Sequence, residues 1–430
     1  MHYVLSPFGS VGDVNPFLAL GQELLRRGER VTLLANGYFA DAVQRAGLGY
    51  IELGTKAEYL EAAANPLLWS PMRALRLILS ECVAVLMRQH YQHLESLQQQ
   101  EPIVAVSNLF GAGAMVAREK LGIPLAVIHL QPSVFWSDLR PPRLPGLFGP
   151  LWLQRWMYHV GERYWIDPAF CPALNKWRAE LGLSPVQGVT HWWHQAELVG
   201  ALFPDWFGPP QPDWPQPFVQ TSFPLWDEQH DEPLAPEIES FLSEGEPPIV
   251  FTPGSANQFG NEYFTAAVGA CERLQRRGLL LTRFPEQIPE NLPNDVRYFS
   301  YAPFQLLLPR SAALVHHGGI GSTAQAMAAG IPQLIAAMAH DQFDNAQRIH
   351  QLQVGDSTKF VGLNARRLAR KLQPLLESAA VGEACRRAAN KLAARDGIAQ
   401  MAAHLQARFN SKPADAVSGQ TSTHPAQPHI

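Results

Sequence analysis

The segment HHGGIGST at residues 316–323 carries the clearest fold signal in the chain. An apolar run at residues 312–315 precedes it, as expected of a short buried strand, and a helical pattern follows at residues 324–329. Ser322 and Thr323 stand where an N-cap would open that helix, and the glycines before them allow close backbone approach. The free N–H groups and positive dipole end of such a helix predict an anion site.

The polar residues around this helix indicate what the anion belongs to. His317 lies beside the predicted helix mouth, whereas His316 fits a strand end where its imidazole is satisfied by local hydrogen bonds. Asp341 and Gln342 come after the next apolar run, at residues 333–338, and can bind hydroxyl groups. A phosphate that carries a hydroxyl-rich group suggests a nucleotide-sugar as the ligand.

A glycine-bearing loop near the N-terminus, GSVGDVNP at residues 9–16, is the counterpart of this motif. Asp13 either caps the helix expected at residues 17–27 or faces a cleft as a proton acceptor. The chain has no Asp-x-Asp pair, so we do not expect a metal held by paired aspartates. A cationic histidine and helix N–H groups would then stabilise a departing diphosphate.

Strand and helix patterns alternate in both halves of the chain. This predicts an α/β protein with two Rossmann-like parallel-sheet domains facing each other across a cleft. The expected strands lie at residues 3–6, 31–35, 50–53, 103–106 and 125–129, and at residues 249–252, 279–282, 297–300, 312–315 and 333–338.

A proline- and tryptophan-rich stretch at residues 203–236 separates the two halves, and we interpret it as an ordered connector because proline interrupts sheets and helices. Its acidic run, residues 227–232, is expected to be exposed. The expected divisions are an acceptor-binding domain at 1–225, a linker at 226–247, a nucleotide-sugar-binding domain at 248–385, a C-terminal helix at 386–410 that can pack back on the N-terminal domain, and a disordered tail at 411–430.

The bulk composition is that of a globular protein, with 430 residues, 47% of them apolar and 17% charged. The formal net charge of −4 gives no general attraction to nucleic acid. Four widely separated cysteines fit reduced thiols, and neither a signal peptide nor a membrane-spanning run is recognised, so a cytoplasmic protein is expected. A basic stretch at residues 366–395 is interpreted as a solvated helix face, with contact to a membrane surface as the alternative.

Two other classes of protein compete with a sugar-transferring enzyme. GIGSTA at residues 319–324 matches the G-x-G-x-x-A form of the dinucleotide fingerprint, with Asp341 about 20 residues further on, which favours an NAD(P)-dependent oxidoreductase. Against this, the motif lies in the second half of the chain and leaves the loop at 9–16 without a use. The third interpretation is a protein that binds a nucleotide-sugar without catalysing a reaction. The presence of both Asp13 and His317 argues against it.

Taken together, the motifs resemble those of family 1 glycosyltransferases of the GT-B fold, over nearly the whole chain to about residue 406. The matching segments are Tyr301-Ala302-Pro303, Leu306-Leu307-Leu308, His317-x-Gly319-x-x-Ser322-Thr323, Gly330-Ile331-Pro332 and Asp341-Gln342. The resemblance implies an inverting, metal-independent enzyme in which Tyr301 stacks on the base of the donor and the Ala302 backbone hydrogen-bonds to it.

The same resemblance assigns further roles to residues of both cleft loops. The diphosphate would be held by His317, Gly319, Gly321, Ser322 and Thr323. Asp341 and Gln342 would bind sugar hydroxyls, and Ser10 and Ser255 match small polar positions. Asp13 stands where plant members carry their histidine base, so the resemblance implies that Asp13 takes that role.

Two residues depart from the family motif. Phe304 stands where glutamine is usual, and Gln325 stands where a glutamate binds the ribose hydroxyls. A neutral amide binds a diol less firmly than a carboxylate does. Gln325 is therefore compatible with a deoxyribose donor such as a dTDP-sugar.

Residues 203–217, 223–225 and 339–346 are in addition closely similar to rhamnolipid-forming rhamnosyltransferases. This implies dTDP-L-rhamnose as donor and a 3-(3-hydroxyalkanoyloxy)alkanoate lipid as acceptor, with a glucosyltransferase that uses UDP- or dTDP-glucose as the alternative. A lipid acceptor in turn implies peripheral membrane contact and a partner enzyme that makes the acceptor. Phe135, Trp136 and the apolar side chains of residues 67–86 are candidates for binding it.

Overall fold

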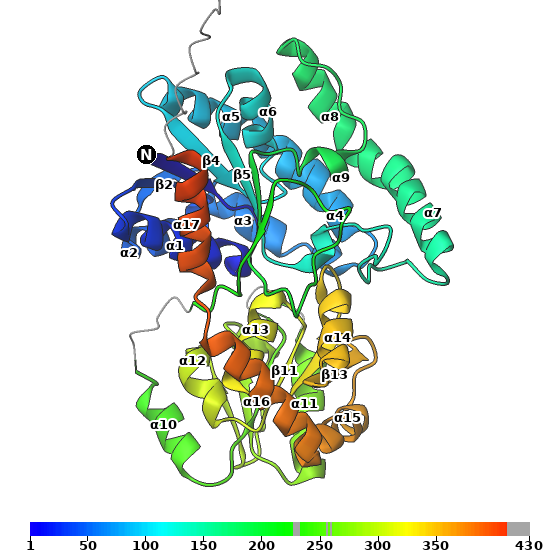
Figure 1. Ribbon diagram of the computed structural model, residues 1–430. Coiled ribbons are helices and arrows are strands. Elements are labelled where there is room, and N and C mark those ends of the chain that lie inside the picture. Colours follow the sequence, from blue (N-terminus) through cyan, green and yellow to red (C-terminus); the bar gives the residue numbers. More distant parts are fainter. Residues whose placement is uncertain (227–232, 255–256, 259, 411–430) are drawn as a thin grey trace, which may run out of the picture.

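The computed structural model describes residues 1–226, 233–254, 257–258 and 260–410. Each half of the chain forms one parallel sheet with helices packed against it (Figure 1). This is the predicted architecture of two Rossmann-like domains. Three expectations fall outside the described residues: the exposure of the acidic run 227–232, the role of Ser255 and the disordered tail 411–430.

The first sheet has seven parallel strands in the order β3-β2-β1-β4-β5-β6-β7. They are β1 (His2–Ser6), β2 (Arg30–Ala35), β3 (Gly49–Glu52), β4 (Ile103–Ser107), β5 (Leu125–His129), β6 (Leu198–Ala201) and β7 (Phe218–Gln220). Every residue of β1, β4 and β5 is buried, because helices on both faces leave no side for polar residues.

The helices of this half are α1 (Val11–Arg26), α2 (Ala40–Arg45), α3 (Lys56–Ala63), α4 (Ala74–Leu77), α5 (Ala84–Gln98), α6 (Ala112–Leu121), α7 (Leu151–Gly161), α8 (Asp167–Glu180) and α9 (Val189–Trp192). Two π-helical turns, η3 (Ile78–Val83) and η5 (Glu162–Ile166), interrupt this set. Such turns are frequent at functional sites.

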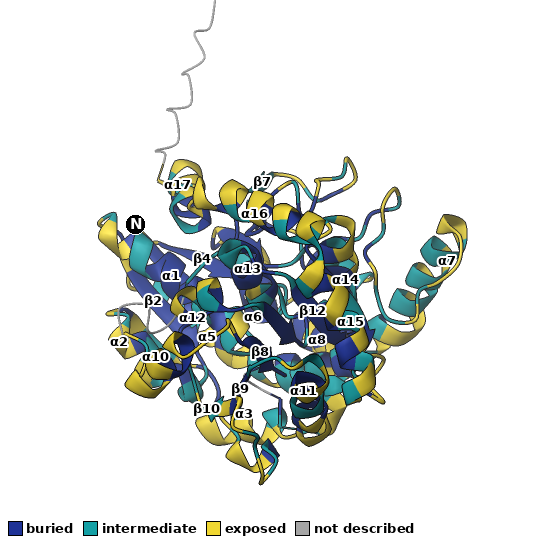
Figure 2. Ribbon diagram, turned by 90° about the horizontal axis from the view of Figure 1, so that it is seen from below, coloured by how far each residue is buried: buried dark blue, intermediate teal, exposed yellow. Residues whose placement is uncertain are grey.

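The second sheet has six parallel strands in the order β10-β9-β8-β11-β12-β13. They are β8 (Ile249–Thr252), β9 (Gly278–Leu281), β10 (Val296–Phe299), β11 (Ala313–His316), β12 (Gln333–Ala337) and β13 (Gly355–Lys359). The helices of this half are α10 (Pro236–Ser243), α11 (Asn261–Leu274), α12 (Phe304–Leu307), α13 (Ile320–Ala329), α14 (Gln342–Gln351), α15 (Ala365–Glu377), α16 (Ala379–Ala393) and α17 (Gly397–Phe409). Figure 2 shows the buried strands enclosed by half-exposed helices.

The structure departs from the sequence expectations at several elements. Strands β6, β7 and β13 were not expected, and β7 lies within the stretch that was interpreted only as a connector. β13, of sequence GDSTK, lies at a sheet edge, where a strand needs few apolar residues. The helix expected at 386–410 is two helices, α16 and α17, because the chain turns at Ala394 and restarts at the N-cap Asp396.

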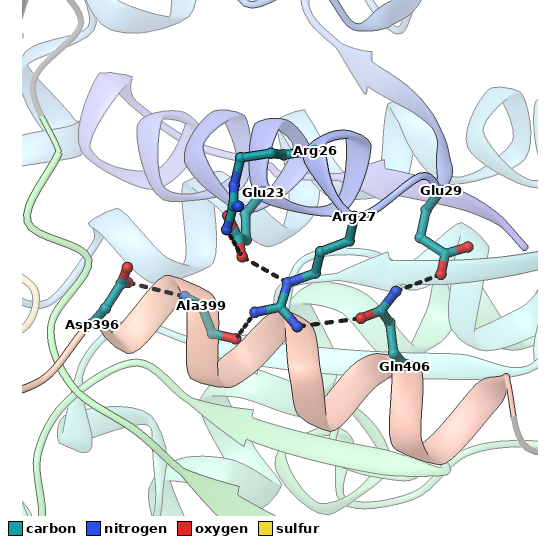
Figure 3. A network of polar contacts seen from close by, with 7 residues as sticks. All are labelled: Glu23, Arg26, Arg27, Glu29, Asp396, Ala399 and Gln406. Atoms are coloured by element: carbon teal, nitrogen blue, oxygen red, sulfur yellow. Dashed lines mark hydrogen bonds and ion pairs between the residues drawn. The ribbon is translucent and has the colours of Figure 1, made fainter.

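The last helix, α17, crosses back to the first domain and packs against α1 (Figure 1). Met401, Ala402 and Leu405 are fully buried in the first domain's core. At the surface, Arg27 donates to the Ala399 carbonyl at 2.9 Å and to Gln406, which in turn donates to Glu29 at 2.6 Å (Figure 3). The C-terminal helix therefore stabilises the first domain.

We predict that Leu405→Ala will destabilise the first domain by about 2–5 kcal/mol, because it leaves a cavity in a packed core. Urea unfolding followed by tryptophan fluorescence will show this as a lower transition midpoint. The neighbouring His404 is exposed, and His404→Ala is the matched control with an expected change within about 0.5 kcal/mol. Equal midpoints for the two variants would contradict the structural role of α17.

Candidate functional site

The site lies where the two sheets present the carboxyl ends of their central strands. In the first sheet the chain adds strands on one side of β1 up to β3 and then continues on the other side with β4. In the second sheet the same change of direction occurs between β8 and β11. Ligands bind at such points in open α/β sheets, because the connecting helices leave on opposite faces and open a crevice. Segments that follow all four strands line one cavity of about 1330 Å³ that both domains share.

Asp13 lies in the first turn of α1 and borders this cavity. Its carboxylate accepts hydrogen bonds from the Ser10 backbone N–H at 2.8 Å and from the Ser10 hydroxyl at 3.0 Å. Gly9 has a φ of +132°, and a Cβ there would lie 2.3 Å from the Asp13 carboxylate. The capping and proton-accepting interpretations of Asp13 are thus compatible, because the capping contact holds the carboxylate at the cavity wall.

Asp13 and Asp341 come from opposite domains and interact electrostatically. Burial raises the pKa of Asp13 above its ordinary value, although the hydrogen bonds from Ser10 oppose the shift. Burial also raises the pKa of Asp341, to about 7, and the negative charge of Asp13 adds to this, against a 2.7 Å hydrogen bond from Asn345. One carboxyl of the pair therefore readily holds a proton near neutral pH.

The two histidines of the motif have different surroundings. His316 is buried and bonds through its two ring nitrogens to Gln333 at 3.0 Å and to the Gly318 N–H at 3.1 Å, so it is a structural residue at the strand end. His317 lines the cavity, and its buried Nδ1 has no partner among the described residues. A Cβ at Gly254 or Gly319 would come within 2.7 Å of the His317 ring, so glycine is needed on both sides of it.

Without a bound anion, His317 is not the cation that the sequence analysis expected beside the diphosphate. Burial, together with the neighbouring His340, lowers the pKa of His317 to about 4. The imidazole is therefore neutral at pH 7. It can still offer an N–H to an anion, and an anionic ligand would raise this pKa.

Helix α13 begins earlier than its sequence pattern suggested. Gly319 is the N-cap and Ile320 the first helical residue, so Ser322 and Thr323 lie inside the first turns instead of capping the helix. Gly321, Ser322 and Gln325 line the cavity. Thr323 is buried outside the cavity lining, and its hydroxyl donates to the Gly319 carbonyl at 3.0 Å, so the structure does not bring it to the site.

The remaining donor-site residues also meet at the cavity. Tyr301 is half-buried and Ala302 buried, and both line the cavity after β10. Gln342 lines it from the start of α14, and its side-chain carbonyl accepts the N–H groups of Met338 at 2.6 Å and Ala339 at 3.0 Å. Gln342 therefore shapes the loop after β12 as well as bordering the site.

The cavity continues into an apolar end formed by the first domain. Leu68, Trp69, Leu75, Ile78 and Leu86 line it, as the candidate region 67–86 suggested. Trp136 also borders this end. Its ring stacks on that of Tyr158 with a centroid distance of 3.7 Å.

Phe135 does not reach the cavity. Its ring is buried between those of Trp214 and His194, with centroid distances of 4.7 and 5.4 Å. Residues 132–134 form a tight turn that directs the next side chain into the core. The acceptor role expected of Phe135 is therefore wrong.

Sequence analysis missed the part of the apolar end that α7 and η5 provide. Met157, Val160, Trp165 and Ile166 line it. The many aromatic residues of LWLQRWMYHVGERYWI could have indicated an apolar binding surface. No expected strand lies next to this segment in the sequence, however, so its position relative to the cavity could not be predicted.

Among the residues the structure describes, no three His, Cys, Asp or Glu side chains gather as metal ligands would. Within the same part of the chain, every helix is too short or too polar to cross a lipid bilayer.

The position of the glycine motif decides against a dinucleotide fingerprint. In that fold the motif follows the first strand of the sheet, where it receives the pyrophosphate. Here it follows β11, the fourth strand of its sheet in chain order.

Comparison with known proteins agrees with this geometry. Residues 3–133 match the model of the glycosyltransferase family 28 N-terminal domain, and residues 282–407 match the C-terminal domain of erythromycin biosynthesis protein CIII-like proteins. The chain is 29% identical to O-mycaminosyltylonolide 6-deoxyallosyltransferase of Streptomyces fradiae over 442 residues, which covers 93% of this chain and 95% of that protein.

It is also 30% identical to the glycosyltransferase GtfE of Amycolatopsis orientalis over 373 residues, covering 83% of this chain and 85% of that protein. The solved structure of the glycosyltransferase VinC in complex with dTDP is similar with a TM-score of 0.66 at 20% identity, over 95% of this chain and 99% of that one. The chain therefore belongs to the GT-B glycosyltransferases, enzymes that transfer a sugar from a nucleotide-sugar donor.

Proposed function

We propose that this enzyme transfers L-rhamnose from dTDP-L-rhamnose, with inversion, to the hydroxyl of a 3-(3-hydroxyalkanoyloxy)alkanoate lipid. The observation that carries the proposal is the composition of the shared cavity. Its second-domain wall has the helix N-terminus, His317 and Asp341, whereas its first-domain wall carries Asp13 and a stretch of large apolar side chains. A charged donor and a lipophilic acceptor would each meet a matching surface.

In the proposed mechanism Asp13 removes the proton from the acceptor hydroxyl as its oxygen attacks the anomeric carbon. The bond from that carbon to the diphosphate oxygen breaks on the opposite face, which inverts the configuration. The N–H groups at the start of α13 and the imidazole N–H of His317 donate hydrogen bonds to the leaving diphosphate and stabilise its growing charge, so the proposed step requires no metal ion.

The donor assignment draws on chemistry and on similar proteins. Gln325 replaces the carboxylate that would bind a ribose diol, which suits a deoxyribose. The structure of VinC contains dTDP, and that of the glycosyltransferase SsfS6 contains thymidine diphosphate. The Streptomyces fradiae relative is named for a 6-deoxyhexose, the class of sugar to which rhamnose belongs.

The acceptor assignment rests on the apolar end of the cavity. Leu68, Ile78, Val83 and Leu86 of the first domain offer no directional hydrogen bonds, so they suit an alkyl chain better than a polar aglycone. An enzyme that makes the hydroxylated lipid would be the partner in this proposal.

The purified enzyme should convert dTDP-L-rhamnose and a hydroxyalkanoyloxyalkanoate to a lipid one rhamnose heavier, as measured by mass spectrometry. A mixed panel with UDP-glucose, dTDP-glucose and several lipid acceptors makes the assay a competition. Exclusive transfer of glucose would reject the rhamnose assignment. Transfer only to polar acceptors would reject the lipid.

Asp13→Asn should lower the rate of transfer about 10²–10⁴-fold, because an amide cannot accept the proton. Donor binding, measured by calorimetry with dTDP, should change little, since Asp13 belongs to the first domain. Near-normal turnover in this variant would remove Asp13 from the mechanism.

The pH dependence tests the same residue independently. The base must be ionised, and because its pKa is raised from the ordinary 3.8, kcat/KM should rise with pH along a limb above that value. The charge of Asp13 raises the pKa of Asp341, so Asp341 is still protonated while Asp13 ionises, and Asp341→Asn should leave this limb in place, whatever it does to the maximal rate. A limb that moves to lower pH in this variant would show that the charge of Asp341 raises the pKa of Asp13.

His317→Ala should weaken dTDP binding and lower kcat together, because one phosphate contact serves both the bound donor and the transition state. The matched control is His316→Gln at the structural histidine, which should lower thermal stability and leave the affinity of the folded protein for dTDP nearly unchanged. Unchanged kinetics in His317→Ala would refute its role.

A further inference from the structure

Helix α7 and the π-helical turn η5 form an apolar segment that the fold does not bury. Figures 1 and 2 both show α7 standing off from the body of the first domain. No residue of α7 or η5 is buried, although the sequence LWLQRWMYHVG is mostly apolar. An amphipathic helix of a globular protein normally turns its apolar side to the core.

The exposed apolar side chains are large and mainly aromatic. Trp152 is 68% exposed, Trp156 60% and Tyr164 74%. We call the exposed side chains of Phe148, Leu151, Trp152, Trp156, Tyr164 and Trp165 the α7 rim. Isolated exposed apolar residues need no explanation, but a contiguous segment of them marks an interaction surface.

Most charges around the α7 rim are positive, and the acid that precedes the segment, Asp138, has its carboxylate 3.9 Å from the Nε2 atom of His159. Residues 139–166 contain four arginines and a single acid, Glu162, in a chain whose net charge is −4. Glu162 accepts hydrogen bonds from Thr190 and faces the protein. Arg140, Arg143 and Arg163 are exposed. The segment therefore offers positive charge and aromatic side chains together.

The α7 rim is continuous with the apolar end of the cavity. Trp156 and Trp165 are exposed and also line the cavity, as does Met72 beside Gly146. A molecule that leaves the rim for the interior thus meets apolar side chains at each step.

We propose that the α7 rim docks the enzyme on an anionic lipid surface, and that the lipid acceptor passes from this surface directly into the cavity. Tryptophan and tyrosine prefer the boundary between water and lipid, where the apolar ring and the polar group are both satisfied. Arginine beside them binds anionic headgroups. The passage of acceptor rests on the proposed function, whereas docking itself can be measured without turnover.

A second copy of this chain is the competing occupant. In a two-fold interface the same patch meets itself, so the exposed arginines of one copy would face those of the other. The two acids within residues 138–166 already have partners in the same chain, Asp138 with Trp136 and His159 and Glu162 with Thr190, so they compensate this repulsion poorly. The lipid surface is therefore favoured.

The test compares two double variants of the full-length enzyme. Phe148→Ser with Trp152→Ser removes exposed rim side chains that do not line the cavity. Arg366→Glu with Arg370→Glu reverses exposed charges on α15, the other basic surface of the chain. Flotation with vesicles of phosphatidylcholine, with and without phosphatidylglycerol, measures binding.

Wild-type enzyme should float with the anionic vesicles, and the rim variant should bind them about tenfold or more less tightly, because two buried aromatic contacts are lost. The α15 variant should bind like the wild type. Equal binding by the rim variant and the wild type overturns the proposal. So does loss of binding in the α15 variant alone, or a wild-type dimer that the rim variant converts to monomer in light scattering.

Kinetics then separate this proposal from the proposed function. On a short-chain acceptor dissolved in water the rim variant should keep the wild-type kcat/KM, whereas on acceptor embedded in vesicles it should lose about tenfold. An equal loss on both acceptors overturns the docking role. If wild-type enzyme glycosylates no lipid, the proposed function fails, and the flotation result still decides whether the α7 rim binds membranes.

Discussion

The cleft depends on a steric constraint at the carboxyl ends of three parallel strands, where glycine leaves room for a reactive side chain. After β1, Gly9 makes room for the Asp13 carboxylate. After β8 and β11, Gly254 and Gly319 enclose the His317 ring. Any Cβ at these glycines would lie within 2.7 Å of the functional group. Because all strands of each sheet are parallel, the loops lie at one edge, and the two edges face each other across a single cavity.

The same close packing determines the charge state of the site. Desolvation raises the pKa of Asp13 and Asp341 and lowers that of His317, so each group is shifted toward its neutral form. A diphosphate near His317 would reverse part of this shift, since its negative charge favours the imidazolium. Donor binding would therefore change the protonation of the cleft. A bound donor would also bring negative charge toward Asp341 and Asp13, which makes the pair more basic and Asp13 a better proton acceptor.

Sequence reasoning located the donor side well, because phosphate recognition needs glycine, a helix N-terminus and polar residues at set spacings. It placed His317, Asp341 and Gln342 on the cavity wall and predicted both sheets. It erred where tertiary contacts decide. The hydroxyl of Thr323 turns back to Gly319, and Phe135 packs between Trp214 and His194, which no local pattern reveals. The neutral state of His317 likewise depends on burial, a property of the folded chain alone.

The apolar end of the cavity was predicted only in part, for a physical reason that also bears on the selectivity of the proposed enzyme. Its walls come from α4, η3, α7 and η5, and contact with an alkyl chain asks only for apolar surface, so many sequences serve equally and no motif arises. For the proposed lipid acceptor, such a wall would distinguish chain lengths by about 0.8 kcal/mol for each buried methylene. Selectivity for one methylene more or less is therefore modest. The volume of the cavity, more than any single side chain, would set the range of chain lengths that the enzyme accepts.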